Sequence, residues 1–199
     1  MKQILHLLLE NKPLSDLCTL GIGGPARYYI EVKNLQEMID ALSFSKSANI
    51  PFFVLGKGSN CLFDDRGFNG LVIHNKIDFL NSASNVFHVG AGYSFSRLGT
   101  HTAKQGLCGL EFASGIPASV GGAVFMNAGA NGCETKDCLI SVDFLNEEGQ
   151  FICYKKEHIE FRYRYSSFQT IKGAIVGATF ALSKNSMARS KQIEIIPLG

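Results

Sequence analysis

The sequence predicts an α+β fold built from two subdomains, and three observations lead to this prediction. Short runs rich in aromatic and β-branched residues outnumber the segments with helical periodicity. One pair of these runs is joined by Glu147-Glu148-Gly149, a hairpin signal that favours α+β over a doubly wound parallel sheet. Hydrophobic residues make up 46% of the 199 residues and charged residues 18%, as is typical of a packed globular chain.

The first subdomain is predicted over residues 1–75. Strands are expected at 27–32 (RYYIEV), 51–55 (PFFVL) and 71–75 (LVIHN), because each is a short apolar run bounded by turn residues. A helix is expected between the first two strands. Asn34 and Glu37 form a capping pair at its start, and apolar residues then recur at helical spacing as far as Leu42.

The second subdomain is predicted over residues 76–184. It begins with a strand at 85–92, followed by a helix from Ser94 to about Gln105 that Gly106 ends. After a glycine-rich stretch come hairpin strands at 140–146 and 150–156 and a last strand at 174–182. Residues 185–199 are expected to begin a linker or a third domain, because their apolar residues are left without partners.

Charge and composition exclude several classes of function. The 19 basic and 17 acidic side chains give a formal net charge of +2 without a basic stripe, so no nucleic-acid partner is expected. No apolar run reaches the roughly 18 residues of a membrane span, and the amino terminus lacks a signal-peptide pattern, so a cytoplasmic protein with no membrane partner is expected. The six irregularly spaced cysteines are expected to be reduced and mostly buried, the five scattered histidines structural, and no metal site is expected.

The segment LGKGSN (55–60) directly follows a predicted strand and is a candidate phosphate-binding loop. Gly56 and Gly58 can adopt positive φ, successive amides then form an anion-binding concavity, and Ser59 and Asn60 add side-chain donors. The third glycine and the following helix of a Rossmann site are absent. An ordinary Gly-Asn turn is the alternative interpretation of this segment.

The segment GLEFASGIPASVGGAVFMNAGA (109–130) is poor in reactive side chains. Between Ser114 and Gly122 it has hydroxyls and glycines but no acidic residue, so phosphate oxygens or a flavin ring can lie against its backbone. Tight packing of a helix on a sheet is the alternative explanation. A dinucleotide that bridges two subdomains accounts for both glycine-rich segments together.

The segment FRYRYSSF (161–168) places two arginines among aromatic residues. On a regular strand, alternation would send Arg162 and Arg164 to one face and the aromatic residues to the other. An exposed basic sheet edge explains this pattern, and so does a guanidinium that clamps a carboxylate or phosphate. Local sequence leaves both interpretations open.

Taken in order, these segments resemble the UDP-N-acetylenolpyruvoylglucosamine reductases (MurB enzymes), flavoenzymes of bacterial cell-wall synthesis. The resemblance covers about residues 19–182 and rests on TLGIGGPARYY (19–29), LGKGSN (55–60), residues 109–130 and FRYRYSSF (161–168), in the family's order and spacing. It is closer to the compact branch of the family, because an insertion found in the other branch is missing.

The resemblance implies an FAD-binding fold of the vanillyl-alcohol-oxidase type, with FAD extended between the two subdomains and NADPH as its reductant. The implied substrate is the small molecule UDP-N-acetylglucosamine enolpyruvate, reduced to UDP-N-acetylmuramate by a monomer. Tyr163 and Arg164 match the family's substrate-binding pair, with Arg164 catalytic. The residues expected around the cofactor are Gly56, Lys57, Gly58, Ser59, Asn60, Ser114, Gly115, Ile116, Pro117, Ala118, Ser119, Gly121, Gly122, Ala123, Asn127, Ala128 and Gly129.

One departure from the family leaves two other functions open. The family's proton-donating serine lies in a G-S-x-F-x-N-P motif of a third domain, with a glutamate further on, and neither has a match in this sequence. An FAD-binding module without full catalysis is therefore one alternative. A flavin oxidase or dehydrogenase of a hydroxy acid is the other, and it is disfavoured because no histidine stands beside either glycine-rich segment in the sequence.

Overall fold

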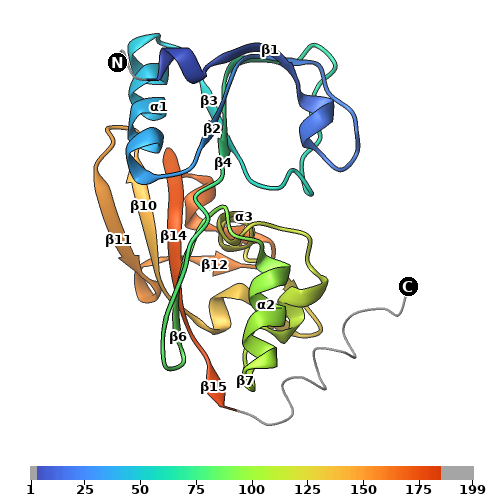
Figure 1. Cartoon of the computed structure of the whole chain (residues 1–199), viewed down its shortest axis with the longest axis vertical. Helices are drawn as coiled ribbons and strands as arrows, with labels where there is room; N and C mark the ends of the chain where they lie inside the picture. The colour runs from blue at the N-terminus through green and yellow to red at the C-terminus, as the bar shows by residue number, and fades with distance from the viewer. Residues whose placement is uncertain (1–3, 185–199) are drawn as a thin grey trace.

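The computed structural model describes residues 4–184, in which two larger sheets follow one another along the long axis of the molecule (Figure 1). The first has the strand order β1-β2-β4-β3, in which β2, β4 and β3 are parallel and β1 is antiparallel to β2. Its strands are β1 (Leu9–Pro13), β2 (Pro25–Val32), β3 (Phe52–Leu55) and β4 (Phe68–Asn75).

The helix α1 (Leu35–Ser47) connects β2 to β3 and begins as the sequence predicts. The Asn34 side chain accepts a hydrogen bond from the Glu37 amide at 3.0 Å, and the Glu37 carboxylate accepts one from the Lys33 amide at 2.6 Å. α1 buries Met38 and Leu42 in a cluster that also contains apolar residues of both sheets. One shared core thus fixes the first sheet against the second.

The second sheet is antiparallel throughout and has the strand order β11-β10-β14-β6-β5. Its strands are β5 (Leu80–Ala83), β6 (Val86–Gly90), β10 (Leu139–Asn146), β11 (Phe151–Lys155) and β14 (Gly173–Ala181). The predicted hairpin joins β10 to β11, with Gly149 in the turn at φ +77°. The strand β5 escapes prediction, since LNSA carries one large apolar side chain and no alternation.

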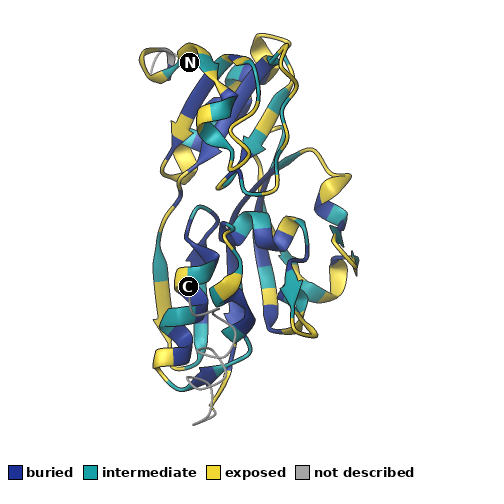
Figure 2. Ribbon diagram, turned by 90° about the vertical axis from the view of Figure 1, so that its right-hand side faces the viewer, coloured by how far each residue is buried: buried dark blue, intermediate teal, exposed yellow. Residues whose placement is uncertain are grey.

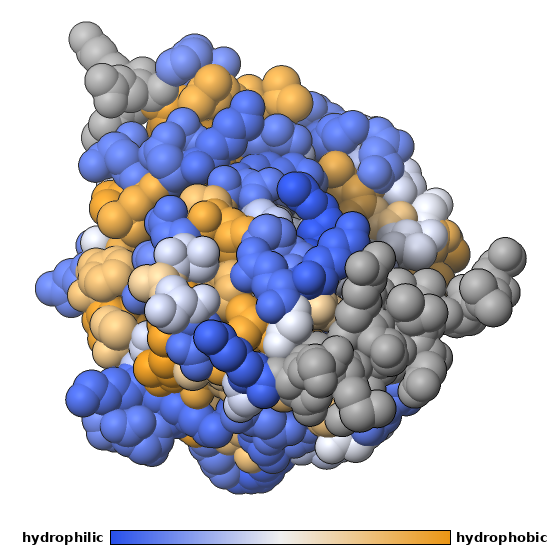
Figure 3. Space-filling view, turned by 60° about the horizontal axis from the view of Figure 1, so that its bottom comes forward, coloured by the Kyte–Doolittle hydropathy of each residue, from blue (hydrophilic) through white to orange (hydrophobic). Residues whose placement is uncertain are grey.

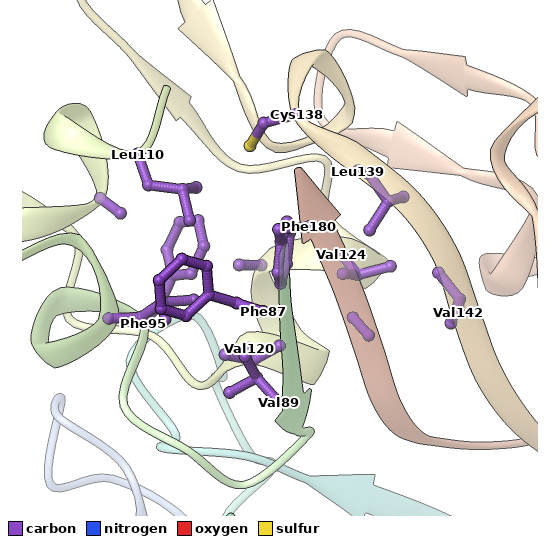
Figure 4. Packing of buried hydrophobic residues seen from close by; sticks show 14 of the residues in the cluster. Phe87, Val89, Phe95, Leu110, Val120, Val124, Cys138, Leu139, Val142 and Phe180 are labelled. Carbon is purple, nitrogen blue, oxygen red and sulfur yellow. The ribbon is translucent and has the colours of Figure 1, made fainter. Parts of the chain in front are cut away.

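Two helices cover one face of this sheet, α2 (Phe95–Lys104) and α3 (Val120–Phe125). Ser94 caps α2, and Gly106 follows its end at φ +71°, as the sequence predicts. Between helices and sheet lies the largest buried cluster, in which Phe87, Phe95 and Phe180 are fully buried and point toward one another (Figure 4).

Shorter elements complete the chain. Two-stranded ladders join β7 to β15, β8 to β9, and β12 to β13, and short 3-10 turns lie between the longer elements. Their bounds are β7 Leu107–Cys108, β8 Gly129–Ala130, β9 Cys133–Glu134, β12 Phe161–Arg162, β13 Tyr165–Ser166, β15 Ser183–Lys184, η1 Leu5–Leu7, η2 Leu14–Leu17, η3 Glu111–Gly115, η4 Thr135–Asp137, η5 Lys156–His158 and η6 Ser167–Gln169.

The predicted α+β class is confirmed, and the expectation that the cysteines are mostly buried is wrong. Within the second glycine-rich segment, α3 forms once Ser119 caps the helix. Residues 161–166 form a tight hairpin and not one regular strand, so alternation does not sort their side chains. Of the six thiols only Cys138 is buried, and burial raises its pKa to about 12.

Burial follows the two sheets, whose central strands are dark blue in Figure 2 while the connecting loops are mostly exposed. On the face turned forward in Figure 3, hydrophilic and hydrophobic residues are interspersed and neither kind covers the face. Within residues 4–184 no helix is long and apolar enough to cross a bilayer. The expected linker or third-domain segment at 185–199 lies outside the described residues.

Candidate cofactor site

A cavity of about 1210 Å³ lies where the two sheets meet, and both glycine-rich segments line it. The two segments touch each other. A Cβ atom placed on Gly56 would lie 2.3 Å from the Ser119 hydroxyl, so a larger residue would displace that side chain. Ser119 also forms an isolated β-bridge with Ser94 at the start of α2. The cavity wall is therefore continuous from one segment to the other.

The loop after β3 lines this cavity and contains backbone amides that have no partner within the protein, among the described residues. Gly58 has the predicted positive φ of 68°, and a Cβ there would lie 1.8 Å from the carbonyl oxygen of Leu17. Gly56 lies outside the positive-φ region, and its small size serves the contact with Ser119 instead. In the described part of the chain, the amides of Lys57, Gly58 and Ser59 donate no hydrogen bond to another protein group. Successive free amides of this kind form an anion-binding concavity.

Positive charge gathers beside the same loop. The Lys57 ammonium donates a hydrogen bond to the Ser94 hydroxyl at 2.7 Å. Burial lowers the pKa of Lys57, and the charges of Arg97 and Lys76 lower it further. Within residues 4–184, neither Lys57 nor Arg164 of the cavity wall has a carboxylate within 4.0 Å. An anionic group bound here would relieve this repulsion.

The second segment lines the cavity in a different way, because most of its amides already donate hydrogen bonds within the protein. The amide of Ala118 donates to Ile116, that of Val120 to Tyr93, and that of Gly121 to Ala91. A Cβ on Gly121 would lie 2.9 Å from the Ala91 Cβ, so this glycine allows close packing of α3, as the alternative explanation of the segment holds. What remains for a ligand is a smooth wall with few polar groups. Ile116, Pro117 and Ala118 form its apolar part.

The hairpin of β12 and β13 brings Arg164 to the wall of the cavity. Arg162 pairs with Tyr165, which leaves Tyr163 and Arg164 as a two-residue turn. Arg164 adopts a positive φ of 56°, and its guanidinium donates to the Gly129 carbonyl oxygen at 3.3 Å. Its Cζ atom lies 5.4 Å from the centre of the Tyr163 ring. An exposed guanidinium with unused donors can bind a carboxylate or phosphate.

A histidine lies beside the first glycine-rich segment in space, although none stands beside it in the sequence. His74 of β4 pairs with Leu55 of β3, and the ring of His74 interacts with the backbone of Gly56. The hydroxyl of Tyr29 lies 2.8 Å from its Nδ1 atom. Burial lowers the pKa of His74 to about 4, so the ring is neutral at pH 7 and acts as a structural support.

The structure brings most, but not all, of the expected residues to the cavity. Six do not line it. The Ala123 side chain is buried in the core, Asn127 is buried with hydrogen bonds to the backbone, and Tyr163 is 82% exposed. Ser114 and Gly115 belong to η3, and Gly129 belongs to β8. The lining residues are Gly56, Lys57, Gly58, Ser59, Asn60, Ile116, Pro117, Ala118, Ser119, Gly121, Gly122, Ala128 and Arg164.

Other lining residues escape prediction from the sequence. Phe125 and Met126 end α3, and Gln169 follows the hairpin. No spacing or motif distinguishes Gln169 in the sequence. Phe125 and Met126 lie inside a segment that the sequence does single out, but the helix that turns them toward the cavity is not evident from the glycine content.

Residues 26–153 match a family described as FAD binding domain. The chain belongs to this family. As an FAD-binding domain it is 60% identical over 184 residues to a UDP-N-acetylenolpyruvoylglucosamine reductase of Protochlamydia amoebophila, and 44% identical over 188 residues to one of Chlamydia muridarum. These matches cover 92% and 94% of the chain, and 62% and 64% of the two relatives.

A solved structure shows the same fold. The crystal structure of a UDP-N-acetylenolpyruvylglucosamine reductase (MurB) from Thermus caldophilus superposes with a TM-score of 0.79 at 34% identity, over 94% of this chain and 66% of that one. The resemblance found in the sequence is therefore confirmed. The chain spans about three fifths of the length of the curated relatives that it matches.

Proposed function

We propose that this chain binds FAD in the cavity between its sheets and takes part in the NADPH-dependent reduction of UDP-N-acetylglucosamine enolpyruvate to UDP-N-acetylmuramate. The contact between Gly56 and Ser119 carries the proposal, since it unites two side-chain-poor segments in one wall that also includes Arg164. The names of the similar proteins support the choice of substrate.

The cavity fits a flavin dinucleotide in size and in chemistry. Its volume of about 1210 Å³ lies above the range of about 300–1,000 Å³ that is usual for drug-sized ligands. The free amides of Lys57, Gly58 and Ser59, with the Lys57 ammonium beside them, suit a pyrophosphate. The apolar surface of Ile116, Pro117 and Ala118 suits a flat ring. We therefore assign the pyrophosphate to residues 56–60 and the flavin ring to residues 116–122.

The flavin would supply the redox chemistry, and the residues of this chain would bind and orient. Hydride addition to the methylene carbon of an enolpyruvyl ether places negative charge on the adjacent carbon and its carboxylate. A guanidinium fixed beside that carboxylate stabilises the transition state more than the ground state. Arg164 is the residue we assign to this role, because its guanidinium is exposed at the cavity wall.

Absorbance of the purified protein tests the binding of FAD and its reduction. Flavin bands that bleach on anaerobic addition of NADPH support the reductase. A colourless protein that takes up no FAD would contradict the proposal.

Arg164→Lys tests the role of the guanidinium, since an ammonium cannot hold a planar carboxylate through two parallel hydrogen bonds. We expect flavin content to stay unchanged while reduction of the enolpyruvyl substrate falls by orders of magnitude. Arg162→Lys is the matched control, because Arg162 is paired with Glu160 and does not line the cavity. Equal turnover of Arg164→Lys and the unaltered protein would exclude the clamp.

An FAD-binding module without complete catalysis is the second candidate function. The family match supports it, since it covers residues 26–153 and stops before the hairpin that carries Arg164. A yellow protein whose flavin NADPH never bleaches would favour this module over the reductase.

A further inference from the structure

The backbone of Arg164 adopts a conformation that non-glycine residues seldom take. Its φ of +56° lies in the left-handed region, at the second position of the turn between β12 and β13. Such a conformation persists when surrounding contacts over-determine it. The contacts that hold this turn therefore decide where the guanidinium of Arg164 lies.

One side chain outside the hairpin holds the turn directly. The side-chain nitrogen Nε2 of Gln169 donates to the Arg164 carbonyl oxygen at 3.1 Å and to the Phe125 carbonyl oxygen at 3.0 Å, and the Met126 sulfur lies 3.7 Å from it. Because both carbonyl oxygens are acceptors and lie closer than the sulfur, the two N–H bonds of Nε2 face them. Gln169 thus joins the turn to the end of α3, which lines the cavity.

Two further hydrogen bonds tie the rest of the hairpin to the same helix end. The Ser166 hydroxyl also donates to the Phe125 carbonyl oxygen, at 2.8 Å. The side-chain amide of Asn127 donates to the Arg162 carbonyl oxygen at 3.1 Å. These bonds fix the two strands of the hairpin. Only Gln169 bonds to the backbone of Arg164 itself from outside the hairpin, among the residues that the structure describes.

We propose that Gln169 is a positioning residue, which holds the backbone of Arg164 so that its guanidinium stays at the cavity wall. This proposal rests on the proposed function, because that function gives the Arg164 guanidinium its role. The hydrogen bonds of Gln169 are independent of that function. Because Gln169 also lines the cavity, turnover is expressed per bound FAD, so that a loss of cofactor is not taken for a misplaced Arg164.

Gln169→Glu tests the proposal, since it keeps the length of the side chain and replaces both donors by a carboxylate. The complete gene product, loaded with FAD, is the protein to use. We expect kcat per bound FAD to fall about tenfold or more, as for the loss of a hydrogen bond that orients a charged group, with a Tm near that of the unaltered protein. Gln105→Glu is the matched control, an exposed glutamine at the end of α2 with the same change in charge.

Hydrogen exchange gives a second measurement that does not depend on activity. Gln169→Glu should speed the exchange of peptides that cover residues 161–166 and leave those of residues 86–104 unchanged. In an Arg164→Lys background, Gln169→Glu should cause no further loss of turnover, because both changes act through one group. If Gln169→Glu does not fold, Gln169→Met removes the donors without adding charge.

Turnover and exchange equal to those of the unaltered protein would overturn the proposal. So would faster exchange over the whole chain with loss of flavin, which would mean that Gln169 only stabilises the fold. If Arg164→Lys itself retains full turnover, Arg164 is not the clamp, and the exchange of residues 161–166 then decides alone whether Gln169 holds the turn. A protein that takes up no FAD would instead contradict the proposed function.

Discussion

Protonation of His74 is expected to destabilise the fold by about 3 kcal/mol. The ring is buried beside Tyr29 and the backbone of Gly56, and burial lowers its pKa from 6.5 to about 4. Each tenfold change in proton affinity is worth about 1.4 kcal/mol, which gives this magnitude. Between pH 6.5 and about 4, the unfolded chain binds a proton that the folded chain excludes. His74 therefore does not lower the stability of the fold above pH 6.5, and the free energy of unfolding falls as the pH falls from 6.5 toward 4.

Urea unfolding of the flavin-free protein, followed by circular dichroism at constant ionic strength from pH 7.5 to 4.5, measures this effect. The free energy of unfolding should fall by up to about 1.4 kcal/mol per pH unit below pH 6.5. In His74→Gln this slope should disappear. The control His158→Gln changes an exposed histidine and should keep it. The reasoning is refuted if His74→Gln keeps the slope of the unaltered protein, or if the unaltered protein shows no slope at all.

Three substitutions test other parts of the structure by urea unfolding. Gly58→Ala should lower the free energy of unfolding by more than about 1 kcal/mol and reduce flavin content, because the new Cβ meets a backbone oxygen. Gly132→Ala is the control, since it has a similar positive φ but open space. An equally large loss of stability there would contradict the steric explanation. Phe87→Ala should cost about 3–5 kcal/mol, whereas Phe151→Ala, at an exposed site, should cost far less. Asn34→Ala should cost about 1 kcal/mol and Asn34→Asp much less, and equal losses would show that the side-chain cap is unimportant.

Elements set by local chemistry could be predicted from the sequence. Asn34 and Ser94 cap their helices, and Gly149 closes its hairpin, because each effect involves residues only a few positions apart. The support that His74 gives to Gly56 depends on residues far apart in the chain, and β5 pairs with the nearby β6 although its own residues show no apolar alternation. Periodicity does not report such contacts, so the sequence did not reveal them.

The hairpin of residues 161–166 shows why an alternating pattern does not by itself establish a strand. Aromatic and basic residues alternate in FRYRYSSF as they would along a strand. A turn stands in place of a continuous strand, and the Ser166 hydroxyl and the side-chain amide of Gln169 hold it by donating to the carbonyl oxygen of Phe125, far earlier in the chain. A tertiary contact therefore overrides the local pattern, and it places Arg164 at the cavity.

The two glycine-rich segments have similar composition and yet differ in what their backbones can offer a ligand. In residues 57–59 the amides are free, and a Cβ on Gly58 would meet the backbone of Leu17. In residues 118–121 the amides of Ala118, Val120 and Gly121 already serve the fold. Glycine content alone cannot distinguish these cases, because it records the absence of side chains and not the use of the N–H groups. This difference is the reason for assigning the charged half of the cofactor to the first segment and the flat ring to the second.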